Sequence, residues 1–482
     1  MRQAKTCVWA AMLLISLEAQ LFADHGRSDV DLALSGKGEE AVAAISRLRA
    51  AGPESLKLLL SRRADLEEAA ARQARTDVQA DYSSHLARLD EVIDQVGGAK
   101  YCSASRLYWY TDLEQAKAAA HKSGKPILAL RMLGNLTDEF SCANSRFFRT
   151  TLYANAEISK VLREKFVLHW RSVRPVPKVT IDFGDGRKLE RTLTGNSIHY
   201  VLAPDGTVLE AIPGLYGPQA FLRHLQRGEA LARLMAEATP ERRGELLLDY
   251  HQLAVEELNQ QWEADWQKAQ QALALPPRAS ASQSLERMKA ALAGSPNAPL
   301  NGQPGSQAEQ RAPAPPRAEA AAEVAVPKRR IERKMIEAIN LVKAAPEDVQ
   351  DEKAWNLIAS FHAEESRLDS SSKKVIREQN PVAAAAGRLS RSKSLIEDPV
   401  LKMLVSYEAS IALDSVRNEY LIHRRIHEWF CRFDFEPEIE KLNERVYAEL
   451  FLTPSSDPWL GLAPEDVYTA LPNGGVVAEA AE

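Results

Sequence analysis

The sequence is 482 residues long, more than one ordinary hydrophobic core can hold, so we expect several domains. Apolar residues make up 45% of it and charged residues 26%, which are ordinary shares for a globular protein. The formal net charge of −5 argues against general nucleic-acid binding, because that activity usually depends on a basic surplus. We therefore expect no nucleic-acid partner.

The first 23 residues are arranged like a secretory signal peptide. Arg2 and Lys5 supply positive charge, an apolar stretch covers residues 7–17, and the small residue Ala23 offers a cleavage position. An N-terminal amphipathic helix is the alternative. No other stretch approaches about 18 consecutive apolar residues, so we expect no membrane span once residues 1–23 are removed. The mature protein is then expected to be periplasmic or secreted.

Residues 24–100 have helical periodicity. Apolar residues recur at three- and four-residue spacing on both sides of Gly52-Pro53, a pair that interrupts helices. We expect an antiparallel helix pair with a packing role. It resembles one unit of a helical repeat, although no second copy follows at a fixed period.

Residues 101–230 alternate between helical and extended patterns, as an α/β domain does. The expected helices cover residues 113–122, 143–165 and 219–225. Two short apolar runs are typical of buried strands, and two later pairs of runs surround Asp-Gly turns typical of hairpins. These expected strands cover residues 127–132, 166–170, 179–183 with 188–193, and 198–202 with 207–212.

Residues 231–275 continue as a polar helical extension. Residues 276–328 are rich in proline and alanine, and such a composition buries too little apolar surface to offset the entropy of the chain. We expect a disordered linker there.

Residues 329–482 return to helical periodicity. Trp355, Ile358 and Phe361 fall on one helical stripe, the pattern of a face packed against other elements. We therefore expect a helical C-terminal domain, so that mainly α-helical regions flank the α/β domain on both sides.

Three segments of the α/β region carry a family resemblance. They read WYTDL at 109–113, HKSGKPIL at 121–128 and VLAPDGTV at 201–208. These segments resemble the thioredoxin-like superfamily, in particular its exported members. In that family a lysine–proline pair leads into the central strand, the redox loop follows that strand, and a Pro-Asp-Gly turn joins the last two strands. The resemblance implies a thioredoxin-like α/β fold for residues 101–230, and fold alone does not imply function.

The sequence departs from the redox-active members of that family at two places. The loop after the strand at 127–132 holds one cysteine, Cys142, instead of the Cys-x-x-Cys pair that exchanges disulfides. Ser197 stands where the family places a cis-proline beside the dithiol. We therefore expect no ordinary dithiol exchange.

Cys142 is still the best single candidate for chemistry. If it begins a helix, the helix dipole and nearby Arg146 would favour its thiolate, which could form a mixed disulfide or reduce a peroxide. Cys102, just before the domain, could resolve the product or form a plain structural disulfide with Cys142. We favour the remaining alternative, a buried or bridged structural cysteine.

A second candidate site is on the C-terminal helix, where Glu419, His423, His427 and Cys431 follow one another at four-residue spacing. This spacing places them on one helical face, and residues four apart can share a metal ion. Four ligands spread over three turns cannot all reach one ion, so further ligands would have to come from elsewhere. We favour a partly exposed packing face over metal binding by His423, His427 and Cys431.

These patterns favour a non-catalytic exported protein in which the thioredoxin-like domain recognises a protein or peptide partner or serves as a scaffold. The motivation is a fold whose redox residues are missing, joined by a linker to a second helical region. No cofactor-binding motif is found, so we expect no cofactor. The alternative is an enzyme, either a single-cysteine thiol oxidoreductase or a peroxide-reacting protein, centred on Cys142.

Overall fold

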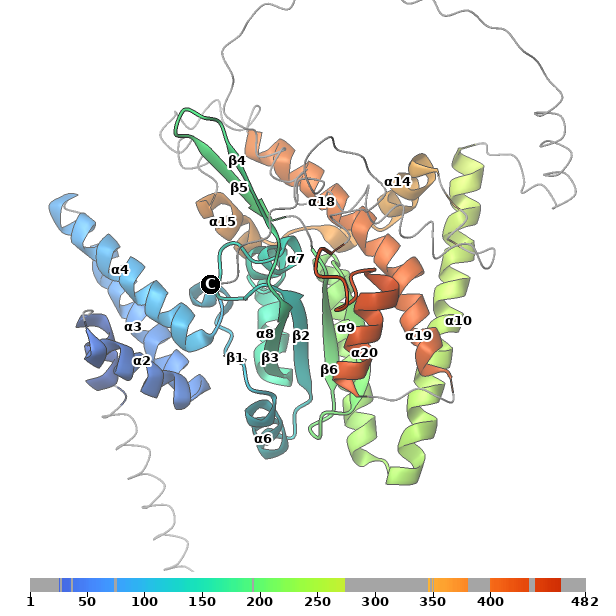
Figure 1. The fold of residues 1–482 in the computed structure, drawn as a ribbon, viewed down its shortest axis with the longest axis horizontal. Helices are drawn as coiled ribbons and strands as arrows, with labels where there is room; N and C mark the ends of the chain where they lie inside the picture. The colour runs from blue at the N-terminus through green and yellow to red at the C-terminus, as the bar shows by residue number, and fades with distance from the viewer. Residues whose placement is uncertain are drawn as a thin grey trace, which may run out of the picture.

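The computed structural model describes residues 28–35, 38–72, 76–192, 195–273, 351–379, 399–432 and 438–460, together with Gly26, Pro346 and Val349. Its centre is a five-stranded mixed sheet flanked by helices, and helices make up most of the described residues (Figure 1). The predicted signal peptide and the predicted linker lie outside the described residues. None of the described helices is both long and apolar enough to cross a membrane.

The central sheet has the strand order β1-β3-β2-β6-β7. β1 and β2 run parallel to β3, whereas β6 is antiparallel to β2 and β7 is antiparallel to β6. The strands cover Trp109–Tyr110 (β1), Ile127–Leu133 (β2), Val167–Arg174 (β3), Ser197–Leu202 (β6) and Val208–Pro213 (β7). The four longer strands confirm the sequence predictions, and β1 is too short for a strand pattern to reveal it.

The middle strand β2 is buried along its whole length. A strand covered on both faces has a continuous apolar run instead of an alternating pattern, which is why its sequence is distinctive. The preceding helix α6 (Leu113–Ser123) begins at Asp112, whose side chain accepts a hydrogen bond from the backbone N of Gln115 at 2.9 Å. It ends at Gly124, which adopts the left-handed conformation with φ of 68°.

The predicted hairpin after β3 forms, but it is a separate two-stranded sheet. Its strands are β4 (Lys178–Asp182) and β5 (Lys188–Thr192), and Gly184 in the turn has φ of 76°. In Figure 1 the hairpin projects away from the central sheet. Ile181 and Phe183 near its tip are 46% and 55% exposed. The hairpin therefore presents apolar side chains to solvent.

The prediction of one helix over residues 143–165 is wrong. The chain forms α7 (Ala143–Phe147), continues as the π-helical segment η1 (Phe148–Leu152), and breaks before α8 (Ala156–Lys165). Asn155 starts α8 by accepting hydrogen bonds from two backbone N–H groups at 3.0 and 3.1 Å. Apolar residues keep their helical spacing across the break, so periodicity alone does not reveal it.

The N-terminal helices stand as a group at one side of the central sheet (Figure 1). They are α2 (Glu39–Ala50), α3 (Pro53–Arg72) and α4 (Thr76–Gly97). The predicted break at Gly52-Pro53 separates α2 from α3, and α4 packs against both. Arg49 joins the group to the sheet, since its guanidinium donates hydrogen bonds to the carbonyl of Val96 at 2.7 Å and to that of Trp109.

Two helices follow the sheet along the chain. α9 (Pro218–Glu237) confirms the helix predicted at 219–225 and continues well beyond it. α10 (Pro240–Ala272) is a single long helix, which lies beside α19 (Arg424–Phe430) in Figure 1. α9 packs against β6 and β7, whereas α10 packs against α9 and against the C-terminal helices.

The C-terminal helices share a hydrophobic core with the sheet. Trp429, Val446 and Tyr447 belong to the same cluster of buried side chains as Leu130 and Trp170 of the central strands. The helical segments are α14 (Glu352–Phe361), η3 (Ala363–Ser366), α15 (Ser370–Gln379), α18 (Pro399–Arg417), η4 (Asn418–His423), α19 (Arg424–Phe430), α20 (Ile439–Arg445) and η5 (Val446–Leu450). This part of the chain therefore packs onto the α/β region.

The prediction that Trp355, Ile358 and Phe361 form one packed face of a helix is confirmed in part. Trp355 and Ile358 are buried in a second, smaller cluster, where Trp262 of α10 packs against Trp355. Phe361, at the end of α14, is 39% exposed and lies outside that cluster.

Candidate functional site

Cys142 lies directly before α7, at its N-cap, but its surroundings are not those of a reactive thiol. The side chain is completely buried, and α7 is only five residues long. Reactive cysteines are partly exposed in electropositive surroundings. Arg146 lies one turn further along, and burial lowers the pKa of its guanidinium while the nearby Cys142 opposes that change. The structure thus brings Cys142 and Arg146 together, but keeps the thiol from solvent.

Cys102 is also buried and belongs to the junction between the N-terminal helices and the sheet. Its Sγ donates a hydrogen bond to the carbonyl of Ala99 at 3.1 Å, and its backbone N donates to Asp94 at 2.8 Å. Burial raises the pKa of the Cys102 thiol far above its ordinary value. Cys102 and Cys142 are both free thiols, so the structural disulfide considered above is not present.

C-terminal residues cover the turn that leads into β6, which begins at Ser197. The side chain of Asn196 donates a hydrogen bond to Oγ1 of Thr453 at 3.0 Å, and the hydroxyl of Tyr447 donates to the carbonyl of Asn196 at 3.2 Å. Arg174 on β3 donates to three backbone carbonyls between 453 and 457, at 2.7–3.1 Å. Residues 447–457 near the C-terminus therefore cover the turn before β6 and contact β3 through Arg174.

The second candidate site is buried inside the molecule. Glu419 and His423 lie on η4 and His427 lies on α19, on one helical face as predicted. His423 and His427 are only 1% and 3% exposed, so the partly exposed packing face that we favoured is wrong for them. Cys431, one turn further, is partly exposed, and it joins neither of the metal-compatible donor groups found among the described residues.

Three further elements complete this cluster. Glu210 comes from β7, His224 from α9 and His251 from α10, and all three are buried. We call Glu210, His224, His251, Glu419, His423 and His427 the histidine–glutamate cluster. It lies where the last strand of the central sheet meets the helices that follow it and the C-terminal helices.

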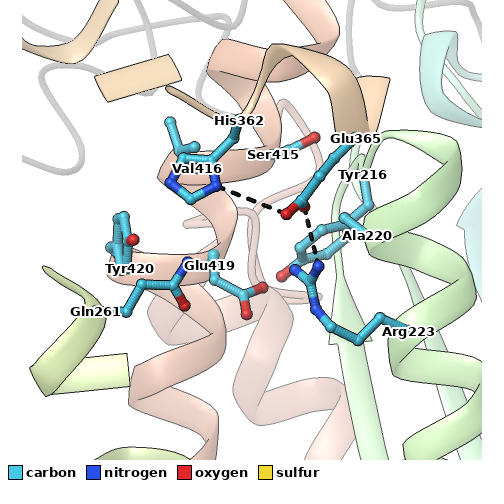
Figure 2. Close-up of a pocket in the computed structure, with 10 residues that line it drawn as sticks. All are labelled: Tyr216, Ala220, Arg223, Gln261, His362, Glu365, Ser415, Val416, Glu419 and Tyr420. Carbon is cyan, nitrogen blue, oxygen red and sulfur yellow. Dashed lines mark ion pairs between the residues drawn. The ribbon is translucent and has the colours of Figure 1, made fainter. Parts of the chain in front are cut away.

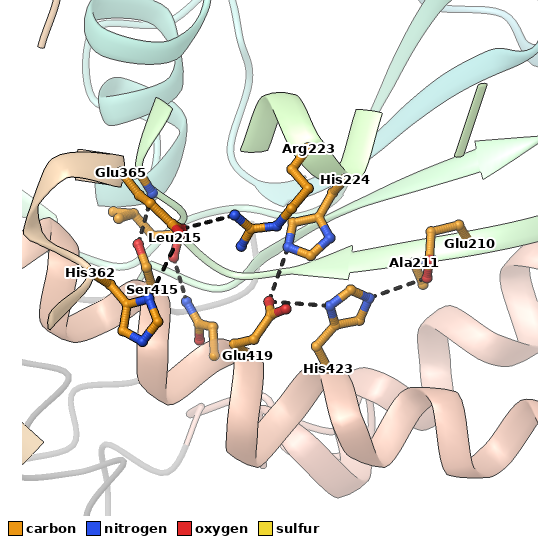
Figure 3. Close-up of polar contacts among 12 residues, drawn as sticks. Glu210, Ala211, Leu215, Arg223, His224, His362, Glu365, Ser415, Glu419 and His423 are labelled. Carbon is orange, nitrogen blue, oxygen red and sulfur yellow. Dashed lines mark hydrogen bonds and ion pairs between the residues drawn. The ribbon is translucent and has the colours of Figure 1, made fainter. Parts of the chain in front are cut away.

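His423 lies between the two carboxylates of the cluster. Its Nε2 is 3.2 Å from Oε1 of Glu210, and its Nδ1 is 3.6 Å from Oε2 of Glu419. His224 Nε2 lies 3.0 Å from the same Glu419 oxygen. Figure 3 shows this line of contacts from His224 through Glu419 and His423 to Glu210. A single imidazole thus faces a carboxylate on each side.

His427 is held by a second histidine. Its Nδ1 lies 2.7 Å from Nδ1 of His251, and Nε2 of His251 lies 3.1 Å from the carbonyl of Leu209. Glu210 is fixed as well, because its carboxylate accepts hydrogen bonds from the hydroxyl of Tyr250 at 2.5 Å and from the backbone N of Ala211 at 2.8 Å.

Burial and pairing divide the cluster into charged and neutral groups. Burial lowers the pKa of His427 well below its ordinary value and that of His251 to about 4. Burial also disfavours a charged His423, but attraction to Glu210 and Glu419 outweighs it and raises the pKa to about 9. Burial by itself would raise the pKa of the Glu210 and Glu419 carboxyls. The neighbouring histidines outweigh burial and hold both pKa values well below their ordinary range.

A small pocket lies directly beside the cluster (Figure 2). Glu419 and Tyr216 line it, together with residues of α9, α10, α18 and η3. Arg223 and His362 both pair with Glu365 in its wall, at 3.1 and 3.7 Å. Glu419 lines this pocket and also faces His423, so it forms a wall shared by the pocket and the cluster.

No family model, no curated protein and no solved structure matches this chain. Its function must therefore be argued from its own residues. Half of the histidine–glutamate cluster could be found in the sequence, because Glu419, His423 and His427 repeat every four residues. Glu210, His224 and His251 sit on separate elements and share no spacing, and the only signal is a glutamate inside the apolar run Val208–Pro213.

Proposed function

We propose that this chain is an exported thioredoxin-fold protein without dithiol chemistry that acts as a recognition or scaffold module for a protein or peptide partner. The observation that carries the proposal is the completely buried Cys142, which follows the central strand and has no thiol partner among the residues that the structure describes. Export rests on the signal-peptide pattern of residues 1–23.

The arrangement of the central sheet supports the thioredoxin-like assignment. Lys125-Pro126 leads into β2, which is the middle strand, and the loop bearing Cys142 follows it. The Pro204-Asp205-Gly206 turn joins β6 to β7, the last two strands. These are the places at which the family resemblance puts the lysine–proline pair, the redox loop and the Pro-Asp-Gly turn.

The β4–β5 hairpin is the surface that suits a partner best. The turn before β6 is covered by the chain's own residues 447–457, so a partner would have to dock elsewhere. Ile181 and Phe183 stand exposed on the projecting hairpin, and Arg187 lies over the Phe183 ring. Exposed aromatic and arginine side chains are the groups that most often anchor protein interfaces.

Thiol accessibility tests the absence of thiol chemistry. In the mature chain with Cys431→Ser, we expect Ellman's reagent to modify Cys142 only after denaturation, and we expect no consumption of hydrogen peroxide. A fast-reacting thiol at neutral pH that disappears in Cys142→Ser, or peroxide turnover by the native protein, would support the single-cysteine enzyme instead.

Photo-cross-linking tests the recognition surface. With a benzoylphenylalanine at position 183 in the producing cells, we expect one discrete adduct whose partner also binds the purified protein. Ile181→Ser should weaken that binding at least tenfold. Leu234→Ser is the matched control, because Leu234 is 52% exposed on α9 and should leave the affinity unchanged. Binding that ignores Ile181→Ser would remove the hairpin from the proposal.

A further inference from the structure

We propose that Glu210, His423 and His427 bind one divalent first-row transition-metal ion, which clamps the C-terminal helices to the central sheet. One donor atom from each residue lies within 4.8 Å of the other two, and all three side chains are buried. Two imidazoles and a carboxylate form a donor set typical of zinc. Ligand atoms around tetrahedral zinc stand about 3.3 Å apart, so small side-chain rotations would close the site.

The protonation pattern leaves His427 ready to bind a cation. The carbonyl of Leu209 can only accept a hydrogen bond, so Nε2 of His251 carries the proton and its Nδ1 accepts. Nδ1 of His427 must then donate to Nδ1 of His251 across their 2.7 Å contact. In neutral His427 this leaves Nε2 without a proton, and an unprotonated ring nitrogen is the form of histidine that binds metal.

The outer contacts of each ligand match those of a metal site. A metal-bound histidine usually donates its second ring N–H to a carboxylate, a carbonyl or another fixed acceptor. His427 has such an acceptor in His251, and Nδ1 of His423, buried and without a hydrogen bond within 3.5 Å, faces Glu419 at 3.6 Å. Tyr250 fixes the carboxylate of Glu210 from the other side. Glu419 and His224 thus belong to the outer contacts of His423.

The charge of the cluster points to a cation. Two carboxylates, those of Glu210 and Glu419, face His423 at 3.2 and 3.6 Å. The nearby arginines are paired elsewhere, Arg227 with Glu257 at 2.6 Å and Arg223 with Glu365 at 3.1 Å. A divalent ion bound beside them would balance both carboxylates, and such neutralisation favours a buried site.

The position of the site predicts its effect. Glu210 belongs to β7, whereas His423 and His427 belong to the C-terminal helices more than 200 positions later. An ion held by all three residues joins these segments only in the folded state, so binding must stabilise the fold.

Zinc titration of the mature, tag-free, chelator-treated protein tests the proposal. We expect one Zn²⁺ per chain by calorimetry and a melting temperature that rises with Zn²⁺ concentration. Glu210→Gln and His427→Gln should each weaken Zn²⁺ binding at least tenfold. His121→Gln is the control, because His121 is exposed on α6 and should leave binding unchanged.

Cobalt provides a readout that does not depend on the variants folding. The Co²⁺-loaded wild-type protein should show intense visible bands of a four- or five-coordinate site and two exchangeable, hyperfine-shifted imidazole N–H signals in its NMR spectrum. No stoichiometric Zn²⁺ binding in the micromolar range would overturn the proposal. Binding that survives both Glu210→Gln and His427→Gln would overturn it too, since the ion would then sit elsewhere.

Discussion

Nη2 of Arg131 lies 2.9 Å from Oε1 of Glu440, although 309 positions separate the two residues in the chain. Arg131 is on the central strand β2 and is 1% exposed, while Glu440 belongs to α20. The other side of the guanidinium faces Nδ1 of His169 at 3.3 Å, and burial together with Arg131 lowers the pKa of His169 to about 3. The C-terminal helix thus supplies the only opposite charge that pairs with Arg131 among the described residues.

We expect Glu440→Gln to lower the free energy of unfolding by about 1–3 kcal/mol, because it removes the charge partner of a buried arginine. Glu440 is itself half exposed, so water keeps the cost below that of a fully buried pair. Glu449→Gln is the control: its carboxylate is equally exposed, and it pairs with Arg445 one helical turn away. Urea denaturation of both variants measures the difference, and equal losses would contradict the assigned role of Arg131.

Arg174→Gln should release the C-terminal segment from the edge of the sheet. The three carbonyls that Arg174 now satisfies would lose a charged donor, and hydrogen exchange of residues 447–457 should accelerate at least tenfold. Arg187→Gln on the exposed hairpin serves as the control. If the exchange of this segment stays the same in Arg174→Gln, the segment is held by other contacts.

Two glycine substitutions should change the free energy of unfolding in opposite directions. A Cβ at Gly217, which precedes α9, would lie 2.6 Å from the carbonyl oxygen of Glu365 and 2.8 Å from Cα of Ser366. Gly217→Ala therefore forces backbone apart and should lower the free energy of unfolding by about 1–3 kcal/mol. Gly244→Ala, in open space on α10, should raise it by up to about 1 kcal/mol. Thermal denaturation gives both values.

The stability of the protein should fall as the pH rises from about 6.5 to 9. Hydrogen bonds to Asp265 and Glu365 raise the pKa of His362 to about 9, so the folded state favours the protonated ring. That stabilisation is complete below the ordinary histidine pKa of about 6.5 and is lost as the pH passes through the folded value.

His423 has a folded pKa in the same range, so His362→Gln should flatten only part of the pH dependence. Denaturant titrations at pH 6 and pH 9.5 measure the pH dependence of stability in wild type, in His362→Gln and in the exposed control His121→Gln. A pH dependence that is the same in wild type and in His362→Gln would show that His362 is not charged in the fold.

Local sequence patterns predicted those strands and hairpins whose formation depends on residues close together in the chain. The apolar run at 127–132 predicted a buried strand, and the Asp-Gly turns predicted both hairpins, because these features depend only on neighbours in the chain. The break before α8 was missed, since a capping asparagine in an otherwise helical pattern carries little local signal.

By itself, the sequence determined the strands and most helices of the central region, the lack of a Cys-x-x-Cys pair, and the helical face shared by Glu419, His423 and His427. Only the tertiary structure decided that this face is buried and that Glu210, His224 and His251 meet it. The 3.6-residue repeat of a helix determines which side chains share one of its faces. Contacts between distant segments depend instead on how whole helices and strands pack. No spacing in the chain encodes that packing.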